Sequence, residues 1–205
     1  MKDNTISSED FWILIRRLNG DAQRCLTALH ETSDDDEEGK SFWRRMYARA
    51  IFALIDGATY RMTFHAYAAR GRPGISFSPG ELIALEESYD FNEDREPVPL
   101  FGTIRSLEQI RFAFEVFARV HDSPYLLPIH EQEWILVKQM AHIRQNLLFC
   151  REPEAIEVYD ENVDDLLFGS KWLIERMVDL LESCLESMTD GMSESDMEPP
   201  PEIVM

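Results

Sequence analysis

The spacing of apolar residues constrains this fold most strongly, because it recurs every three or four positions along nearly the whole chain. Such spacing places apolar side chains on one face of a helix. Residues 74–77 and 156–159 are at best short extended candidates. With 205 residues, 44% of them hydrophobic, the chain can form one globular domain with a sizeable core. We predict an all-α fold, a helical bundle of about five long helices plus one short helix.

Capping and helix-breaking residues set the expected bounds of these helices. Ser78-Pro79-Gly80-Glu81 combines a cap, a proline at the first helical position and a glutamate three residues after the cap, so it predicts a helix start. Gly71-Arg72-Pro73-Gly74 predicts the end of the preceding helix. The expected helices span about 8–29, 41–69, 78–88, 103–121 or 106–121, 128–150 and 162–187.

The segments between and beyond these helices are polar. Residues 31–40 are expected to form an acidic loop within a single helical domain, 1–188, and residues 89–102 a surface loop. Residues 189–205 contain three consecutive prolines, several acids and few large apolar groups, so we expect a disordered acidic tail.

The charge balance bears on possible partners. The formal net charge is −19, and acids concentrate in residues 31–38 and in the tail. Non-specific nucleic-acid binding requires Lys and Arg that neutralise phosphates, so the composition disfavours it. RNA could bind only at a local basic patch, such as the cluster of Arg44, Arg45 and Arg49 or that of Arg70 and Arg72.

Other sequence features limit location and cofactors. No apolar run approaches the roughly 20 residues that span a bilayer, and the polar N-terminus lacks the apolar segment of a signal peptide. The three cysteines, Cys25, Cys150 and Cys184, are widely spaced and odd in number, which favours a reducing cytoplasm over a disulfide framework. No zinc-ligand spacing or glycine-rich phosphate loop stands out, so we expect no metal and no cofactor.

A polar group within the second expected helix is the first candidate site. Arg45, Arg49, Asp56 and Tyr60 are spaced to lie on roughly one side of that helix. Asp56 stands in an otherwise apolar run and therefore needs a cation or several donors, for which Arg49 and Arg144 are the candidates. The resulting ion pair would either fix helix register or leave Arg144 to stabilise a phosphate or a partner's carboxylate.

Several stretches of the chain resemble an uncharacterised group of bacterial helical proteins related to the HEPN superfamily. The resemblance covers roughly residues 40–185 and implies a HEPN-like fold that homodimerises. It is carried by the early-helix segment 42–57, the short helix 78–87, the stretch from Trp134 to Phe149, and the segments 158–161 and 169–172.

HEPN ribonucleases use an Arg that stabilises charge on the scissile phosphate and, a few residues later, a His for general acid–base work. Arg144 matches the Arg, with Gln145 where Asn is common and Asn146 adjacent. The His position falls on Phe149, or on Cys150 or Arg151 with longer spacing. A phenylalanine cannot transfer a proton. The resemblance therefore indicates common ancestry with HEPN proteins more clearly than it indicates ribonuclease activity.

The other histidines offer little compensation in the sequence. His142 precedes Arg144 by two residues and therefore points to a different side of the helix. His65, His121 and His130 are isolated in sequence, and such histidines are more often structural than catalytic.

These observations leave three functional hypotheses. The first is a HEPN-like interaction or regulatory domain without ribonuclease activity, which homodimerises through the fifth helix in a toxin–antitoxin or phage-defence setting. The second is an active HEPN-type endoribonuclease with a rearranged site, using Arg144 with His142 or another His. The third is an acidic inhibitor that occupies the nucleic-acid groove of a basic protein partner.

Overall fold

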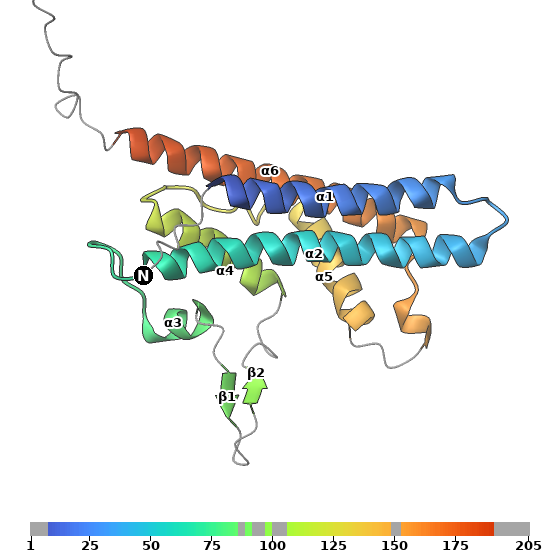
Figure 1. The fold of residues 1–205 in the computed structure, drawn as a ribbon, viewed down its shortest axis with the longest axis horizontal. Helices are drawn as coiled ribbons and strands as arrows, with labels where there is room; N and C mark the ends of the chain where they lie inside the picture. The colour runs from blue at the N-terminus through green and yellow to red at the C-terminus, as the bar shows by residue number, and fades with distance from the viewer. Residues whose placement is uncertain (1–7, 86–88, 92–96, 100–105, 149–152, 191–205) are drawn as a thin grey trace, which may run out of the picture.

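The computed structural model describes residues 8–85, 89–91, 97–99, 106–148 and 153–190, and in this part the chain is a bundle of helices (Figure 1). A short 3-10 helix, η2 (Pro153–Ile156), precedes the last α-helix. The α-helices of the described part are α1 (Ser8–Glu31), α2 (Glu37–Ala69), α3 (Pro79–Leu85), α4 (Ser106–Val120), α5 (Trp134–Leu148) and α6 (Asp160–Asp190). The all-α fold class is confirmed, with α3 as the short helix.

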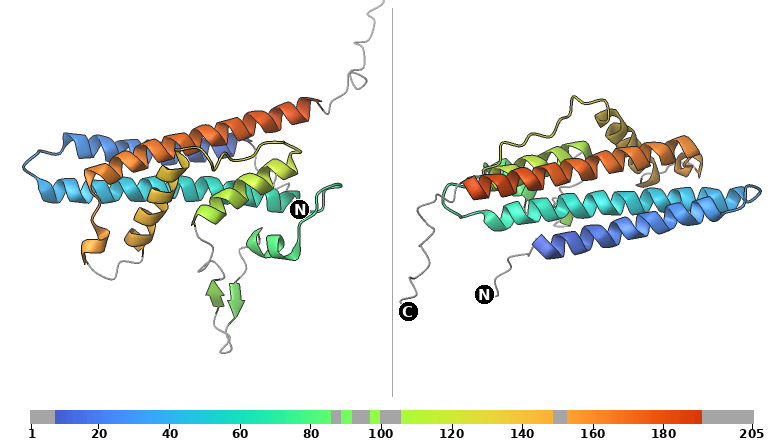
Figure 2. Two further views of the ribbon diagram at one scale, coloured as in Figure 1. Left: turned by 180° about the vertical axis from the view of Figure 1, so that it is seen from behind. Right: turned by 90° about the horizontal axis from the view of Figure 1, so that it is seen from above.

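Helix α2 is the central element of the bundle. It packs against α1, α3, α4, α5 and α6, while α5 packs mainly on α6. Seen from above, α2 lies between α1 and α6 (Figure 2). No helix in the described ranges is both long and apolar enough to cross a bilayer. The largest fully buried side chains of the core include Tyr47, Leu54, Phe114, Met140, Leu166, Leu173 and Leu180.

Helix α2 begins within the predicted acidic loop, so the expected start at residue 41 and the loop bounds 31–40 were wrong. Asp36 caps the helix, because its side chain accepts a hydrogen bond of 2.9 Å from the backbone N–H of Gly39. Glu37 and Glu38 then occupy the first turn, where carboxylates interact favourably with the helix dipole. Glu37 and Glu38 therefore start the helix, while Asp34 and Asp35 lie in the turn that connects α1 to α2.

Helix α5 starts at Trp134 and not at the predicted residue 128. Residues 128–133 form turns, in which the N–H of Glu131 donates to the carbonyl of Pro128. The Glu131 carboxylate accepts a hydrogen bond of 2.9 Å from the indole N–H of Trp172 on α6. Backbone turn bonds such as that from Glu131 to Pro128 replace helical hydrogen bonds in the segment, and the Glu131 side chain attaches it to α6. The expected end at Cys150 lies outside the described residues.

Helix α6 is longer than predicted at both ends. Asn162 was expected to cap it, but its side-chain oxygen reaches back to accept from the N–H of Tyr159, so the helix begins at Asp160. Thr189 and Asp190, predicted to belong to the tail, continue the helix. The hydroxyl of Thr189 donates to carbonyls of the preceding turn, at Leu185 and Glu186. The remainder of the predicted tail, 191–205, lies outside the described residues.

The predicted surface loop 89–102 contains two short strands, β1 (Tyr89–Phe91) and β2 (Pro97–Pro99). They pair antiparallel, with Asp90 opposite Val98. Prolines are tolerated because both strands of a two-stranded sheet are edges and need no hydrogen bond on their outer side. The extended candidates 74–77 and 156–159 form no strand.

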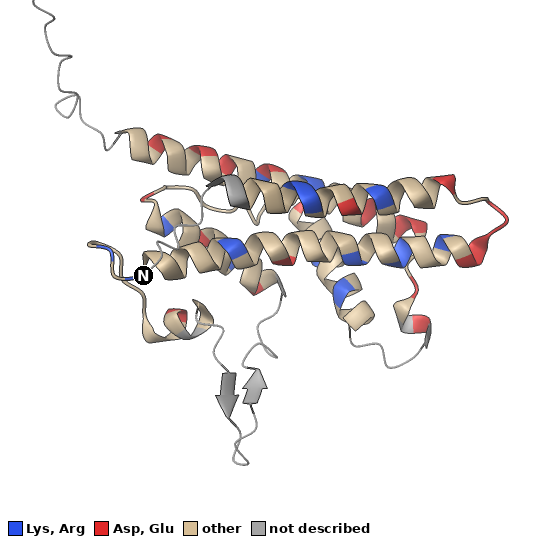
Figure 3. Ribbon diagram, in the orientation of Figure 1, with Lys and Arg blue, Asp and Glu red and all other residues tan. Residues whose placement is uncertain are grey.

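A buried arginine connects the starts of α2 and α6. Arg44 of α2 is buried, and its Nε and Nη1 atoms each lie 2.7 Å from a carboxylate oxygen, on Asp160 and Glu37 respectively. Nearby, the hydroxyl of Ser41 donates to Glu157, which precedes α6, over 2.8 Å. These charged contacts hold together two helices whose N-terminal ends lie at the same end of the bundle (Figure 3).

Candidate functional site

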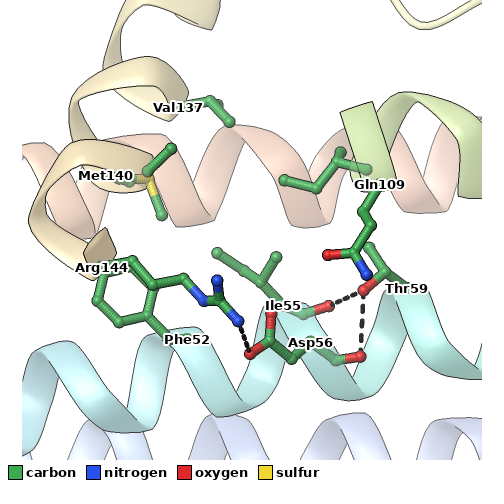
Figure 4. Close-up of a pocket in the computed structure, with 10 residues that line it drawn as sticks. Phe52, Ile55, Asp56, Thr59, Gln109, Val137, Met140 and Arg144 are labelled. Atoms are coloured by element: carbon green, nitrogen blue, oxygen red, sulfur yellow. Dashed lines mark hydrogen bonds and ion pairs between the residues drawn. The ribbon is translucent and has the colours of Figure 1, made fainter. Parts of the chain in front are cut away.

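The structure brings together Arg144 of α5 and Asp56 of α2. The Nη2 atom of Arg144 lies 3.0 Å from Oδ2 of Asp56 (Figure 4). The Asp56 side chain is 50% exposed and that of Arg144 26% exposed, so the sequence-based expectation of a buried carboxylate was wrong. Asp56 is on the rim of the apolar core, where water already solvates it.

The space beside this ion pair is small. It is a cavity of about 20 Å³ between α2, α4 and α5, which includes Phe52, Gln109 and Met140 in its lining (Figure 4). A single water needs about 10–15 Å³ on this measure, so the cavity holds about one water. A nucleotide phosphate would have to displace the lining to reach Arg144 from this side.

The other residues of the predicted polar network lie apart from this ion pair. The Nη1 atom of Arg45 is 3.8 Å from the carboxylate of Glu157, and it also contacts the hydroxyl of Ser41. Arg49 lies beside the sulfur of Met46. Tyr60 is exposed and stacks on Phe64. Arg45, Arg49 and Tyr60 therefore do not join Asp56 and Arg144 in one site.

His142 and Asn146 contact each other on an exposed side of α5. The Nε2 atom of His142 is 3.4 Å from the amide nitrogen of Asn146, one helical turn later. Arg144, in contrast, points toward α2, where it donates to Asp56. Phe149, Cys150 and Arg151, which share the motif's histidine position, lie outside the described residues.

Sequence reasoning missed a second group, the pair formed by His65 of α2 and His121 after α4. Their Nε2 atoms are 3.1 Å apart and their rings stack with centroids 5.0 Å apart. The Phe117 ring packs against both. The two histidines are far apart in sequence and belong to no motif. Only the packing of α2 against α4 brings them together.

Both imidazoles of this pair are uncharged at neutral pH. Burial, followed by the positive charge of Arg72, lowers the pKa of His65. Burial, the neighbouring His65 and Arg72 lower the pKa of His121 to about 4, with Asp122 acting in the opposite direction. One Nε2–H can therefore donate to the other Nε2 within the pair.

The pair lies on the wall of an apolar cavity of about 330 Å³. The lining of the cavity comes from the start of α1, the second half of α2, the end of α4 and the end of α6. These segments lie toward the same end of the bundle (Figure 1). The volume of the cavity falls in the range of small-molecule sites, about 300–1,000 Å³. The lining comprises Phe11, Trp12, Arg61, His65, Phe117, His121, Leu181, Glu182, Cys184, Leu185 and Met188.

Metal chemistry has little support in the described ranges. No group of three or more His, Cys, Asp or Glu side chains there is arranged to hold a metal ion. Burial raises the pKa of the Cys184 thiol, so this cavity residue is protonated and weakly nucleophilic.

No family model, curated protein or solved structure matches the chain. The resemblance to HEPN-related proteins consequently stays a prediction from the residues quoted above.

Proposed function

We propose that this chain is a HEPN-like helical interaction and regulatory domain without ribonuclease activity, acting in a reducing cytoplasm in a toxin–antitoxin or phage-defence setting. The observation that carries the proposal is the ion pair of Arg144 with Asp56, beside a cavity with room for about one water. An arginine engaged in this way supports helix packing, and the residues lining the cavity include no imidazole for proton transfer.

The proposed interaction is self-association through the outer face of α5. Ile135 of α5 is an exposed apolar residue, and exposed apolar side chains favour association. His142 and Asn146 supply hydrogen-bonding groups on the same helix. The HEPN resemblance independently implies a homodimer with the motif helices facing each other.

We expect the full chain to sediment as a dimer in analytical ultracentrifugation, at twice the 23.9 kDa chain mass. Ile135→Glu should shift it to the monomer, because a carboxylate would be desolvated at the interface. Leu126→Glu is the matched control, since Leu126 is exposed but lies outside α5. A monomeric wild type at high concentration, or an Ile135→Glu variant that stays dimeric, would contradict the proposed interface.

The acidic-inhibitor alternative has less support, because several of the acids it requires are engaged within the chain. Asp34 pairs with Lys40, Asp36 caps α2 and Glu37 pairs with Arg44. Acids committed to a cap or an ion pair are less available to imitate phosphates. The ribonuclease alternative requires Arg144 to leave Asp56 and a histidine to approach it.

A further inference from the structure

The cavity next to the His65–His121 pair has the composition of a ligand site. Most of its lining is apolar, with a smaller number of polar side chains, as in small-molecule sites. Three of its apolar residues remain partly exposed, which leaves apolar surface for an occupant to cover. These three are Trp12, Leu185 and Met188.

The charged side chains around the histidine pair balance in sign, so the hydrogen-bonding capacity of the imidazoles decides which head group fits. Arg61 lines the cavity, and the positive charge of Arg72 reaches both imidazoles. The carboxylate of Glu182 is on the α6 wall, and Asp122 is adjacent to His121. An imidazole Nε2–H that now donates to the other histidine can donate instead to a carboxylate oxygen, which is a stronger acceptor.

We propose that this cavity binds a small apolar carboxylic acid. The hydrocarbon body would lie against Trp12, Leu185 and Met188, and the carboxylate would accept a hydrogen bond from the His65–His121 pair. This site is independent of the proposed interaction function and of the Arg144–Asp56 ion pair. A divalent cation fits less well, because the two histidines lack a third metal-binding side chain in the described ranges.

The test is isothermal titration calorimetry on the full chain with decanoate, decanol and decylamine as probes. These share one hydrocarbon body and differ in the head group. We expect saturable binding of decanoate at one molecule per chain, about tenfold tighter than decanol, which corresponds to one hydrogen bond to a charged group. Decylamine should bind most weakly, because its ammonium has no lone pair to accept a hydrogen bond from an imidazole N–H.

Variants separate the head group from the hydrocarbon body. In H65F/H121F we expect decanoate to lose about tenfold in affinity while decanol keeps its own, because only the carboxylate contact is removed. His30→Phe, at an exposed position at the far end of α1, should leave both affinities unchanged. Leu181→Trp should weaken both probes, because it fills the cavity. Thermal melts by circular dichroism verify that each variant is folded.

Two results would overturn the proposal. The first is the absence of saturable decanoate binding to the wild type. The second is equal affinity of the wild type for decanoate and decanol. That result overturns the proposal by itself, and also when the folded H65F/H121F variant keeps its decanoate affinity.

Discussion

The double variant E37Q/D160N is expected to lower the free energy of unfolding by about 3 kcal/mol, because it leaves the buried guanidinium of Arg44 without a carboxylate. The Arg44 side chain is 8% exposed, so water can replace the lost carboxylates only in part. Urea unfolding followed by circular dichroism measures the change. The effect should be largest at low ionic strength, where charges are least screened.

Two controls test whether this loss of stability comes from the unpaired charge of Arg44. E38Q/E161Q removes two acids from the same first turns, so it changes net charge and helix-dipole interactions equally, but in the described part of the chain neither acid pairs with Arg44. We expect a loss below about 1 kcal/mol. Arg44→Met should also cost less than E37Q/D160N, because Glu37 and Asp160 are 73% and 79% exposed and stay hydrated. If Arg44→Met lost more stability than E37Q/D160N, the packing of the Arg44 side chain would matter more than its charge.

Lowering the pH from 7 to 5 is expected to destabilise the chain through the His65–His121 pair. The pKa of His121 is about 4 in the folded chain against an ordinary 6.5, so the unfolded state binds more protons in this window. Stability is therefore complete above about pH 6.5 and is lost as the pH falls toward 4. We expect a loss of about 1–2 kcal/mol at pH 5, with solvent screening included.

The variant H65F/H121F should show a much smaller loss between the two pH values, measured as the shift in urea midpoint. The charged groups facing the pair are Arg61, Arg72, Asp122 and Glu182, and all are retained in this variant. His130→Gln, at an exposed position, is the matched control and should lose as much as wild type. If H65F/H121F lost as much stability between pH 7 and pH 5 as the wild type does, the histidine pair would not be the cause of the loss, and the prediction would be wrong.

Local signals in the sequence predicted most of the fold. The capping box at Ser78 and Glu81 forms as expected, with each residue's N–H donating to the other's side chain. The starts of α2 and α5 were predicted wrongly, because a helix cap sets the first and turns outside the helix set the second. Asp36 caps α2 inside a run of acids that resembles a hydrated loop, and residues 128–133 form turns in which Glu131 contacts Trp172 on α6.

The candidate sites were predictable only in part. Asp56 was recognised as a residue needing a cation, and Arg144 was one of two named candidates for it. The half-exposed position of Asp56 depends on how α5 crosses α2, which periodicity does not specify. The His65–His121 pair and its cavity arise from four helices meeting, so no local pattern marked them.

The most direct test of the central claim is cleavage of labelled single-stranded RNA by an excess of the full chain, compared with Arg144→Ala and with a buffer blank. If Arg144 is a packing residue held by Asp56, the two proteins will leave the RNA as intact as the blank does. Cleavage by the wild type that disappears in Arg144→Ala, while both proteins unfold at the same urea concentration, would contradict the account.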